Sequence, residues 1–143
     1  LDLIQKLVKK IIYDPYVLFY HHRRAVFCPH LEQISRYAVH RGHFARILPK
    51  TSLRFGYLIP SFFVLWLFGG PILILLFKFN FLYLLYLFII SLYVSLLLIT
   101  ATKVCLKEKN LRLALLVIPS IFVTHVVYGL LFIKGCFLNK LAR

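Results

Sequence analysis

The sequence predicts a mainly α-helical integral membrane protein, in which a short β segment and an interfacial amphipathic helix precede three transmembrane helices. Charged side chains are absent from three long ranges, which are 55–77, 79–102 and 113–133. About 20 such residues are enough for a helix to cross roughly 30 Å of hydrocarbon. The 54 residues ahead of these ranges would make only a marginal soluble core. We therefore divide the chain into three parts, 1–28, 29–54 and a transmembrane region, 55–143.

The first part, 1–28, combines a helical pattern with strand-like residues. Leu1–Lys10 places apolar residues at helical spacing opposite its lysines, which predicts the end of an amphipathic helix. Ile11–Tyr13 and Tyr16–Tyr20 are rich in β-branched and aromatic residues, and Asp14-Pro15 between them is a turn signal. Because a lone pair of strands is not stable in water, we expect this piece to be the edge of a sheet whose partners lie outside the sequence.

A helix is predicted from Pro29, since proline suits the first helical turn and no other helix breaker follows before Gly42. Its apolar stripe consists of Leu31, Ile34, Ala38 and Ala45. Another face carries Gln33, Arg36, Tyr37 and His40. These four side chains can hold an anionic phosphate and stack on a sugar or base ring. The alternative is that Arg36 and Tyr37 merely anchor an interfacial helix lying on the membrane surface.

Each predicted span contains features that shape it. Pro49–Ser52 should end the interfacial helix, and Thr51 or Ser52 should cap the first span. Pro71 should kink that span, which we prefer to two short half-helices. Lys78–Asn80 should form a tight turn. In the third span we expect a neutral His125 to hydrogen-bond a Ser, Thr or Tyr of another helix, although an intramembrane ionisable residue is also a functional candidate.

The net charge of +14 points to the membrane surface and not to nucleic acid, because the cations flank the spans. By the positive-inside rule, the N-terminal region and a loop at 103–112 should be cytoplasmic, leaving the C-terminus outside. The cations of the C-terminal tail run against that orientation; they are Lys134, Lys140 and Arg143. The cysteines, Cys28, Cys105 and Cys136, are scattered, so we expect reduced thiols.

Gln33-x-x-Arg36-Tyr37 resembles the Gln-x-x-Arg-Trp motif of membrane-bound family 2 glycosyltransferases of the exopolysaccharide type, with Tyr in place of Trp. Other segments resemble that family in the same order along the chain; these are Ile11–Val17, Tyr20–Arg24, His40–Gly42, Ser52–Pro60, and His125–Gly129 with Gly135. The resemblance implies that 1–28 is the end of an α/β nucleotide-sugar domain. Together with the absence of Met, it predicts that the sequence is a fragment of a larger enzyme.

The resemblance also implies an activity. The enzyme would transfer a sugar, with inversion, from a nucleotide-sugar donor to a lipid-linked or polysaccharide acceptor at the cytoplasmic face of a bacterial or archaeal plasma membrane. Gln33 and Arg36 would contact the diphosphate, and Tyr37 would stand where Trp stacks on the acceptor. His22, Arg23 and Arg24 could help hold the leaving diphosphate. The parent is expected to use a divalent metal, Mg or Mn.

Catalytic carboxylates are missing from the sequence, which contains four acidic residues, Asp2, Asp14, Glu32 and Glu108. They form neither an Asp-x-Asp motif nor a Glu-Asp pair for a general base, so we expect this chain alone to be inactive and to bind no cofactor. The main rival is a non-enzymatic anchoring or assembly protein with a basic cytoplasmic arm. Weaker alternatives are a lipid- or ion-handling protein that uses His125, and a metal site drawn from His21, His22, Cys28, His30, His40 and His43.

Overall fold

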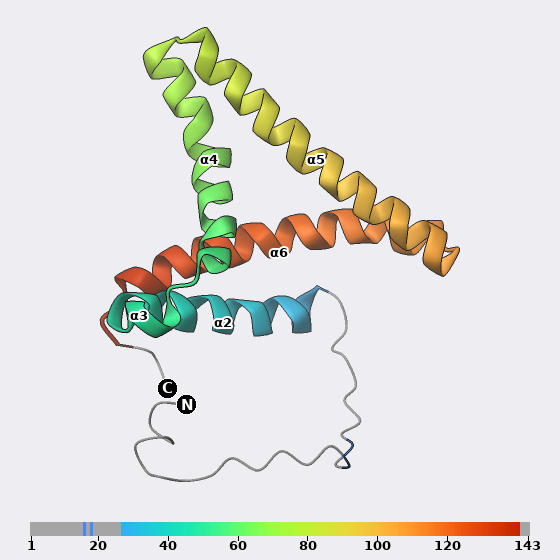
Figure 1. Cartoon of the computed structure of the whole chain (residues 1–143), viewed down its shortest axis with the longest axis horizontal. Helices are drawn as coiled ribbons and strands as arrows, with labels where there is room; N and C mark the ends of the chain where they lie inside the picture. The colour runs from blue at the N-terminus through green and yellow to red at the C-terminus, as the bar shows by residue number, and fades with distance from the viewer. Residues whose placement is uncertain (1–15, 17, 19–26, 141–143) are drawn as a thin grey trace.

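A computed structural model describes residues 16, 18 and 27–140 of the chain (Figure 1). Its helices are α2 (Cys28–Ile47), the single turn α3 (Pro49–Ser52), α4 (Phe55–Phe77), α5 (Asn80–Glu108) and α6 (Leu111–Phe137). Of these, α4, α5 and α6 are long and apolar enough to cross a membrane, so the chain is an integral membrane protein. The described residues form no strand, and the predicted β segment lies almost wholly outside them.

Helix α6 is the centre of the fold, because α2, α4 and α5 all pack on it. Figure 1 shows α2 running alongside the C-terminal half of α6 in the same direction. The core between them contains Ala38, Ala45, Tyr128 and Phe132, with Ile34 packed against it. The apolar stripe predicted for α2 is therefore confirmed. Its partner among the described residues is α6, and the surface position of α2 in the membrane stays a prediction.

The contact between α2 and α6 is close enough to need glycine on both helices. A Cβ at Gly42 would collide with the Phe132 carbonyl, and a Cβ at Gly135 would collide with the Val39 carbonyl. Each collision is with backbone, which cannot rotate away as a side chain can. Small residues thus let the two backbones touch, as they do between transmembrane helices in general.

Helices α4 and α5 form a hairpin that opens toward α6. In Figure 1, α4 leaves the α2/α6 pair steeply and α5 returns obliquely to the N-terminal half of α6. The turn is as short as predicted, because Lys78 adopts a left-handed conformation with φ of 51° and α5 begins at Asn80. Helix α4 passes through both Pro60 and Pro71, so the first span is one helix and the alternative of two half-helices is wrong.

Two boundary predictions are wrong. The loop expected at 103–112 is reduced to Lys109 and Asn110, because α5 continues to Glu108. Charged residues end the membrane-crossing stretch without ending the helix, whose backbone hydrogen bonds are satisfied internally. Neither Thr51 nor Ser52 caps α4, since the N-cap position is Arg54 and lacks a side-chain bond. Helix α6, by contrast, is capped by Asn110, which accepts a hydrogen bond from the Leu113 amide at 3.1 Å.

Candidate functional site

The predicted substrate-binding residues share the side of α2 that faces away from α6. Arg36, Tyr37 and His40 are exposed and Gln33 is half-buried, whereas Ala38 on the opposite side is fully buried. The helical period produces this arrangement, because positions three, four and seven apart fall on one face. The structure therefore brings all four predicted residues together on a surface open to a ligand.

Two local interactions hold this face in order. The Gln33 side-chain amide donates a hydrogen bond to the Tyr37 hydroxyl at 3.2 Å. Arg36 forms an ion pair with Glu32 at 2.8 Å, and both side chains are more than half exposed. Exposed pairs of this kind contribute at most about 1 kcal/mol. An anionic ligand can therefore replace Glu32 as the partner of the Arg36 guanidinium with only a small loss of free energy.

Arg41 belongs to this site, although the sequence prediction did not assign it a role. Its guanidinium lies 4.3 Å from the Tyr57 ring centroid and 5.9 Å from that of Tyr37. The Tyr128 hydroxyl lies near the Arg41 guanidinium and is the main influence that raises the pKa of Arg41. Partial burial lowers this pKa, but by less, and Tyr57 and Tyr37 raise it slightly further. Arg41 therefore stays charged at every physiological pH.

The sequence contains part of the information needed to assign Arg41 to this site. Tyr37 and Arg41 are four residues apart on one helix, which predicts their contact. Tyr57 lies on α4 and Tyr128 on α6, so only the tertiary structure shows that Arg41 lies where three helices meet. The site is thus attached to the membrane spans through a charged residue and two tyrosines.

The histidines of α2 serve different purposes. His43 is buried and its Nδ1 bonds the Leu138 carbonyl at 2.9 Å, while His40 is exposed, so the two do not form a ligand pair. Arg46 donates to the same carbonyl at 2.6 Å. These donors satisfy the C-terminal end of α6, where cations are favoured by the helix dipole.

A metal site is not found in the described part of the chain, where no three His, Cys, Asp or Glu residues come together. The hypothesis built on six His and Cys residues loses its support there, and His21 and His22 lie outside the described residues. The Mg or Mn expected from the resemblance finds no ligand set among 27–140. The other predicted cations at the diphosphate, His22, Arg23 and Arg24, also lie outside the described residues.

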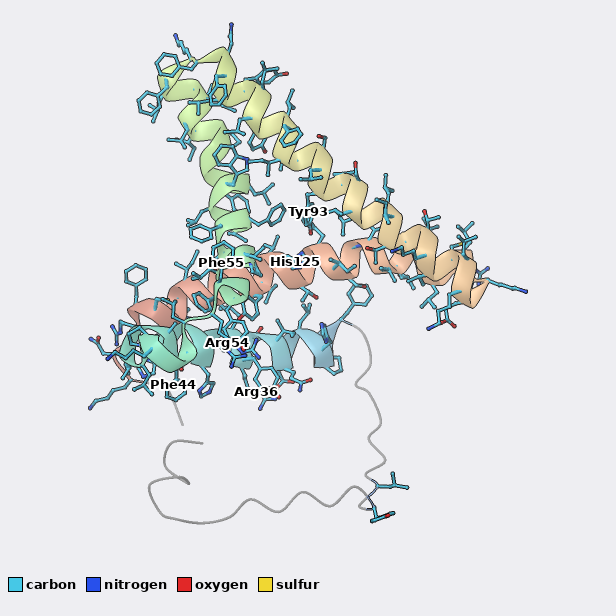
Figure 2. The ribbon with its side chains drawn as sticks, in the orientation of Figure 1. Arg36, Phe44, Arg54, Phe55, Tyr93 and His125 are labelled. Atoms are coloured by element: carbon cyan, nitrogen blue, oxygen red, sulfur yellow. The ribbon has the colours of Figure 1, made fainter. Side chains whose placement is uncertain are left out.

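His125 makes the hydrogen bond to another helix that was predicted for it, and its partner is a tyrosine. Its Nδ1 lies 3.0 Å from the Tyr93 hydroxyl of α5, and Phe63 of α4 stacks on the Tyr93 ring at a centroid distance of 4.2 Å (Figure 2). This contact joins α4, α5 and α6 in the interior. It is separate from the polar face of α2.

Neither a protein-family model, nor a curated protein, nor a solved structure matches the chain. The functional argument consequently depends on the residues and their geometry.

Proposed function

We propose that the chain is the membrane portion of a family 2 glycosyltransferase, in which the exposed face of α2 holds the diphosphate of a nucleotide-sugar donor. The observation that carries this proposal is the grouping of Gln33, Arg36, Tyr37 and His40 on a surface that α6 leaves open. An amide, a guanidinium, a ring and an imidazole suit a phosphorylated sugar.

In the reaction, the acceptor hydroxyl oxygen attacks the anomeric carbon while the bond from that carbon to the nucleoside diphosphate breaks. The hydroxyl proton passes to a carboxylate that this sequence does not supply. Arg36 exchanges Glu32 for the diphosphate and offers paired N–H groups to the charge that develops on it. The Gln33 amide donates beside it, and Tyr37 presents its ring to the acceptor.

Lipid is the surrounding medium, and the acceptor class is a lipid-linked sugar or a glycan. The N-terminal region and α2 would lie on the cytoplasmic side, where nucleotide sugars are found. Arg41, fixed between Tyr37 and Tyr57, would position α2 relative to the spans. Its contacts support this role because they connect the site to the part of the protein that is fixed in the bilayer.

The test is Arg36→Ala in the enzyme that includes the catalytic carboxylates. We expect sugar transfer from a nucleotide-sugar donor to fall about 10- to 100-fold, because a charge-assisted contact to the leaving group is lost. Membrane insertion, measured by carbonate extraction, should be unchanged. Arg112→Ala is the matched control, since this exposed arginine lies in the first turn of α6, at the end of that helix remote from its contact with α2.

Glu32→Gln separates a role in binding from a role in folding. If Arg36 acts on the diphosphate, this variant should keep full transfer because the guanidinium is freed. Equal losses of sugar transfer in Arg36→Ala and Glu32→Gln would show that the ion pair between these residues maintains the structure of α2 and that Arg36 does not bind the diphosphate. Unchanged transfer in Arg36→Ala would refute the diphosphate role and favour the rival, an anchoring protein with a basic cytoplasmic arm.

A further inference from the structure

An open groove of about 630 Å³ lies between the diverging helices α4 and α5. Its walls include Phe55, Ile59, Trp66 and Leu73 of α4, with Ile89 and Leu92 of α5. A second cavity of about 280 Å³ shares Phe63 and Tyr93 with the groove and extends to His125. The groove itself follows α4 from Phe55 to Leu73, over most of the length of that helix.

The groove is unsuited to a glycan. Trp66 and Tyr93 are its only lining residues with polar side-chain atoms. The Tyr93 hydroxyl is already engaged with His125, and the Trp66 Nε1 is buried. Since a sugar hydroxyl buried without a partner costs several kcal/mol, these walls favour a hydrocarbon chain.

One end of the groove, at Phe55, is adjacent in the chain to a cation, Arg54. Arg54 immediately precedes Phe55, the first wall residue, and Tyr57, in the same first turn of α4, contacts Arg41 of α2 (Figure 2 labels Arg54 and Phe55). Arg54 is exposed and has no ion-pair partner within residues 27–140, where Glu32 is taken by Arg36. An anionic group at this end would therefore meet uncompensated charge.

We propose that the groove binds a lipid phosphate, with its hydrocarbon chain between α4 and α5 and its phosphate at Arg54. The charge at one end and the apolar walls along the rest match the two parts of such a molecule. Arginine is well suited to a phosphate because its planar fork donates several N–H groups. The position also fits a bilayer, where headgroups gather with basic and aromatic residues at the interface.

The binding of this lipid is independent of the proposed sugar transfer, but its role as carrier of the acceptor sugar rests on the proposed function. If both hold, the hydroxyl that attacks the donor belongs to a sugar attached to the lipid phosphate, so the acceptor is lipid-linked and not a polysaccharide. The phosphate at Arg54 would lie near the face of α2 that holds the donor, so that donor and acceptor meet at the base of α4.

The test uses the full chain, purified in detergent, and native mass spectrometry of bound lipid. The probes are a long-chain isoprenyl monophosphate, the matching isoprenyl alcohol and phosphatidylglycerol, at equal concentrations. We expect the monophosphate to be retained about tenfold or more over the alcohol, because the charge-assisted hydrogen bonds to Arg54 are available only to the phosphate. Phosphatidylglycerol should be retained less than the monophosphate, because its phosphodiester carries one negative charge, whereas the phosphomonoester can carry two and presents three free oxygens to Arg54.

Two variants divide the site into its parts. Arg54→Gln should bring retention of the monophosphate down to that of the alcohol, while Lys107→Gln, an exposed cation at the end of α5, should not. Leu92→Trp should fill the groove and lower retention of both isoprenyl probes. Leu75→Trp is its control, because Leu75 is 74% exposed on α4 and is not among the residues lining the groove.

Three results would overturn the proposal. Equal retention of the monophosphate and the alcohol would show that Arg54 does not bind the phosphate. Equal retention of phosphatidylglycerol and the monophosphate would show that the groove is occupied by ordinary bilayer lipid. Full binding of the probes to Leu92→Trp would show that the lipid binds outside the groove. None of these results depends on a sugar donor. If the protein does not bind the lipid phosphate but Arg36→Ala still abolishes sugar transfer, only this inference is refuted. If the protein binds the lipid phosphate but Arg36→Ala leaves transfer unchanged, only the proposed function is refuted.

Discussion

The contact between α2 and α6 differs from that between α4 and α5 in the size of the side chains that meet. Gly42 and Gly135 bring the first two backbones together, whereas the walls between α4 and α5 carry large residues such as Phe62 and Trp66 and leave a groove of about 630 Å³. In lipid, an apolar side chain gains little by contacting protein in place of an acyl chain. The comparison teaches that small residues decide where these helices touch.

The glycine positions in α4 support this interpretation within a single helix. A Cβ at Gly70 would come within 2.6 Å of the Tyr86 ring of α5, whereas a Cβ at the adjacent Gly69 would meet nothing within 4 Å. Gly70 lies near the turn, where the hairpin is closed. Toward α6 the facing residues are large and the two helices separate.

The largest expected effect comes from Gly42→Ala, which tests whether the α2/α6 contact depends on glycine. The added methyl group meets the Phe132 backbone, so we expect a destabilisation of about 1–3 kcal/mol, even though alanine is the better helix former. Circular dichroism during unfolding in detergent, with proteolysis of α2 as a second readout, would measure the loss.

Gly69→Ala is the matched control, because it adds the same methyl group in open space. Its stability should equal or exceed that of the wild type by up to about 1 kcal/mol. A Gly42→Ala protein as stable as Gly69→Ala would show that the close contact between α2 and α6 is not needed.

An intermediate effect is expected from Tyr93→Phe, which tests what holds the open side of the hairpin to α6. The change removes the hydroxyl bonded to His125 and keeps the ring that stacks on Phe63. Interhelical hydrogen bonds in membranes average about 0.6 kcal/mol, so a loss of about 0.5–1.5 kcal/mol is expected in the same unfolding assay.

Tyr83→Phe supplies the comparison for this variant, since Tyr83 is 52% exposed on α5. A double-mutant cycle with His125→Ala would isolate the bond itself. Additive losses from the two changes would mean that Tyr93 and His125 do not interact. Loss of sugar transfer in His125→Ala without loss of stability would instead give His125 a chemical role.

The smallest effect is expected at the closed end of the hairpin, where Lys78 has φ of 51°. Glycine adopts this left-handed conformation at lower cost, so Lys78→Gly should raise the free energy of unfolding by a few tenths to about 1 kcal/mol. Thermal unfolding of the purified protein would detect the gain. A loss of stability would indicate that the lysine side chain contributes more than its backbone costs.

Much of the fold follows from local patterns in the sequence. Apolar runs locate the three spans, and helical periodicity identifies Ala38 and Ala45 as buried. Periodicity does not say what covers a buried face, which is why α6 was not predicted as the partner of α2. Helix ends were also missed, since Lys103 ends an apolar run but lies within α5.

The candidate site was predictable to the extent that it is formed by one helix. Gln33, Arg36, Tyr37 and His40 come together because of helical spacing alone. Arg41 meets Tyr57 across a sequence gap, and the groove beside Arg54 exists only because α4 and α5 diverge. Such features depend on the arrangement of whole helices, which pairs of residues close in sequence do not specify.

The pairing of α2 with α6 also has a consequence for the order of assembly. The bond from His43 to the Leu138 carbonyl spans 95 residues, so α2 is complete long before its partner has been made. At about 5–20 residues per second, the ribosome needs roughly 5–20 s to synthesise that interval. During this time α6 is not yet present to cover the apolar stripe of α2, and the membrane surface is a place where an amphipathic helix can bury such a stripe.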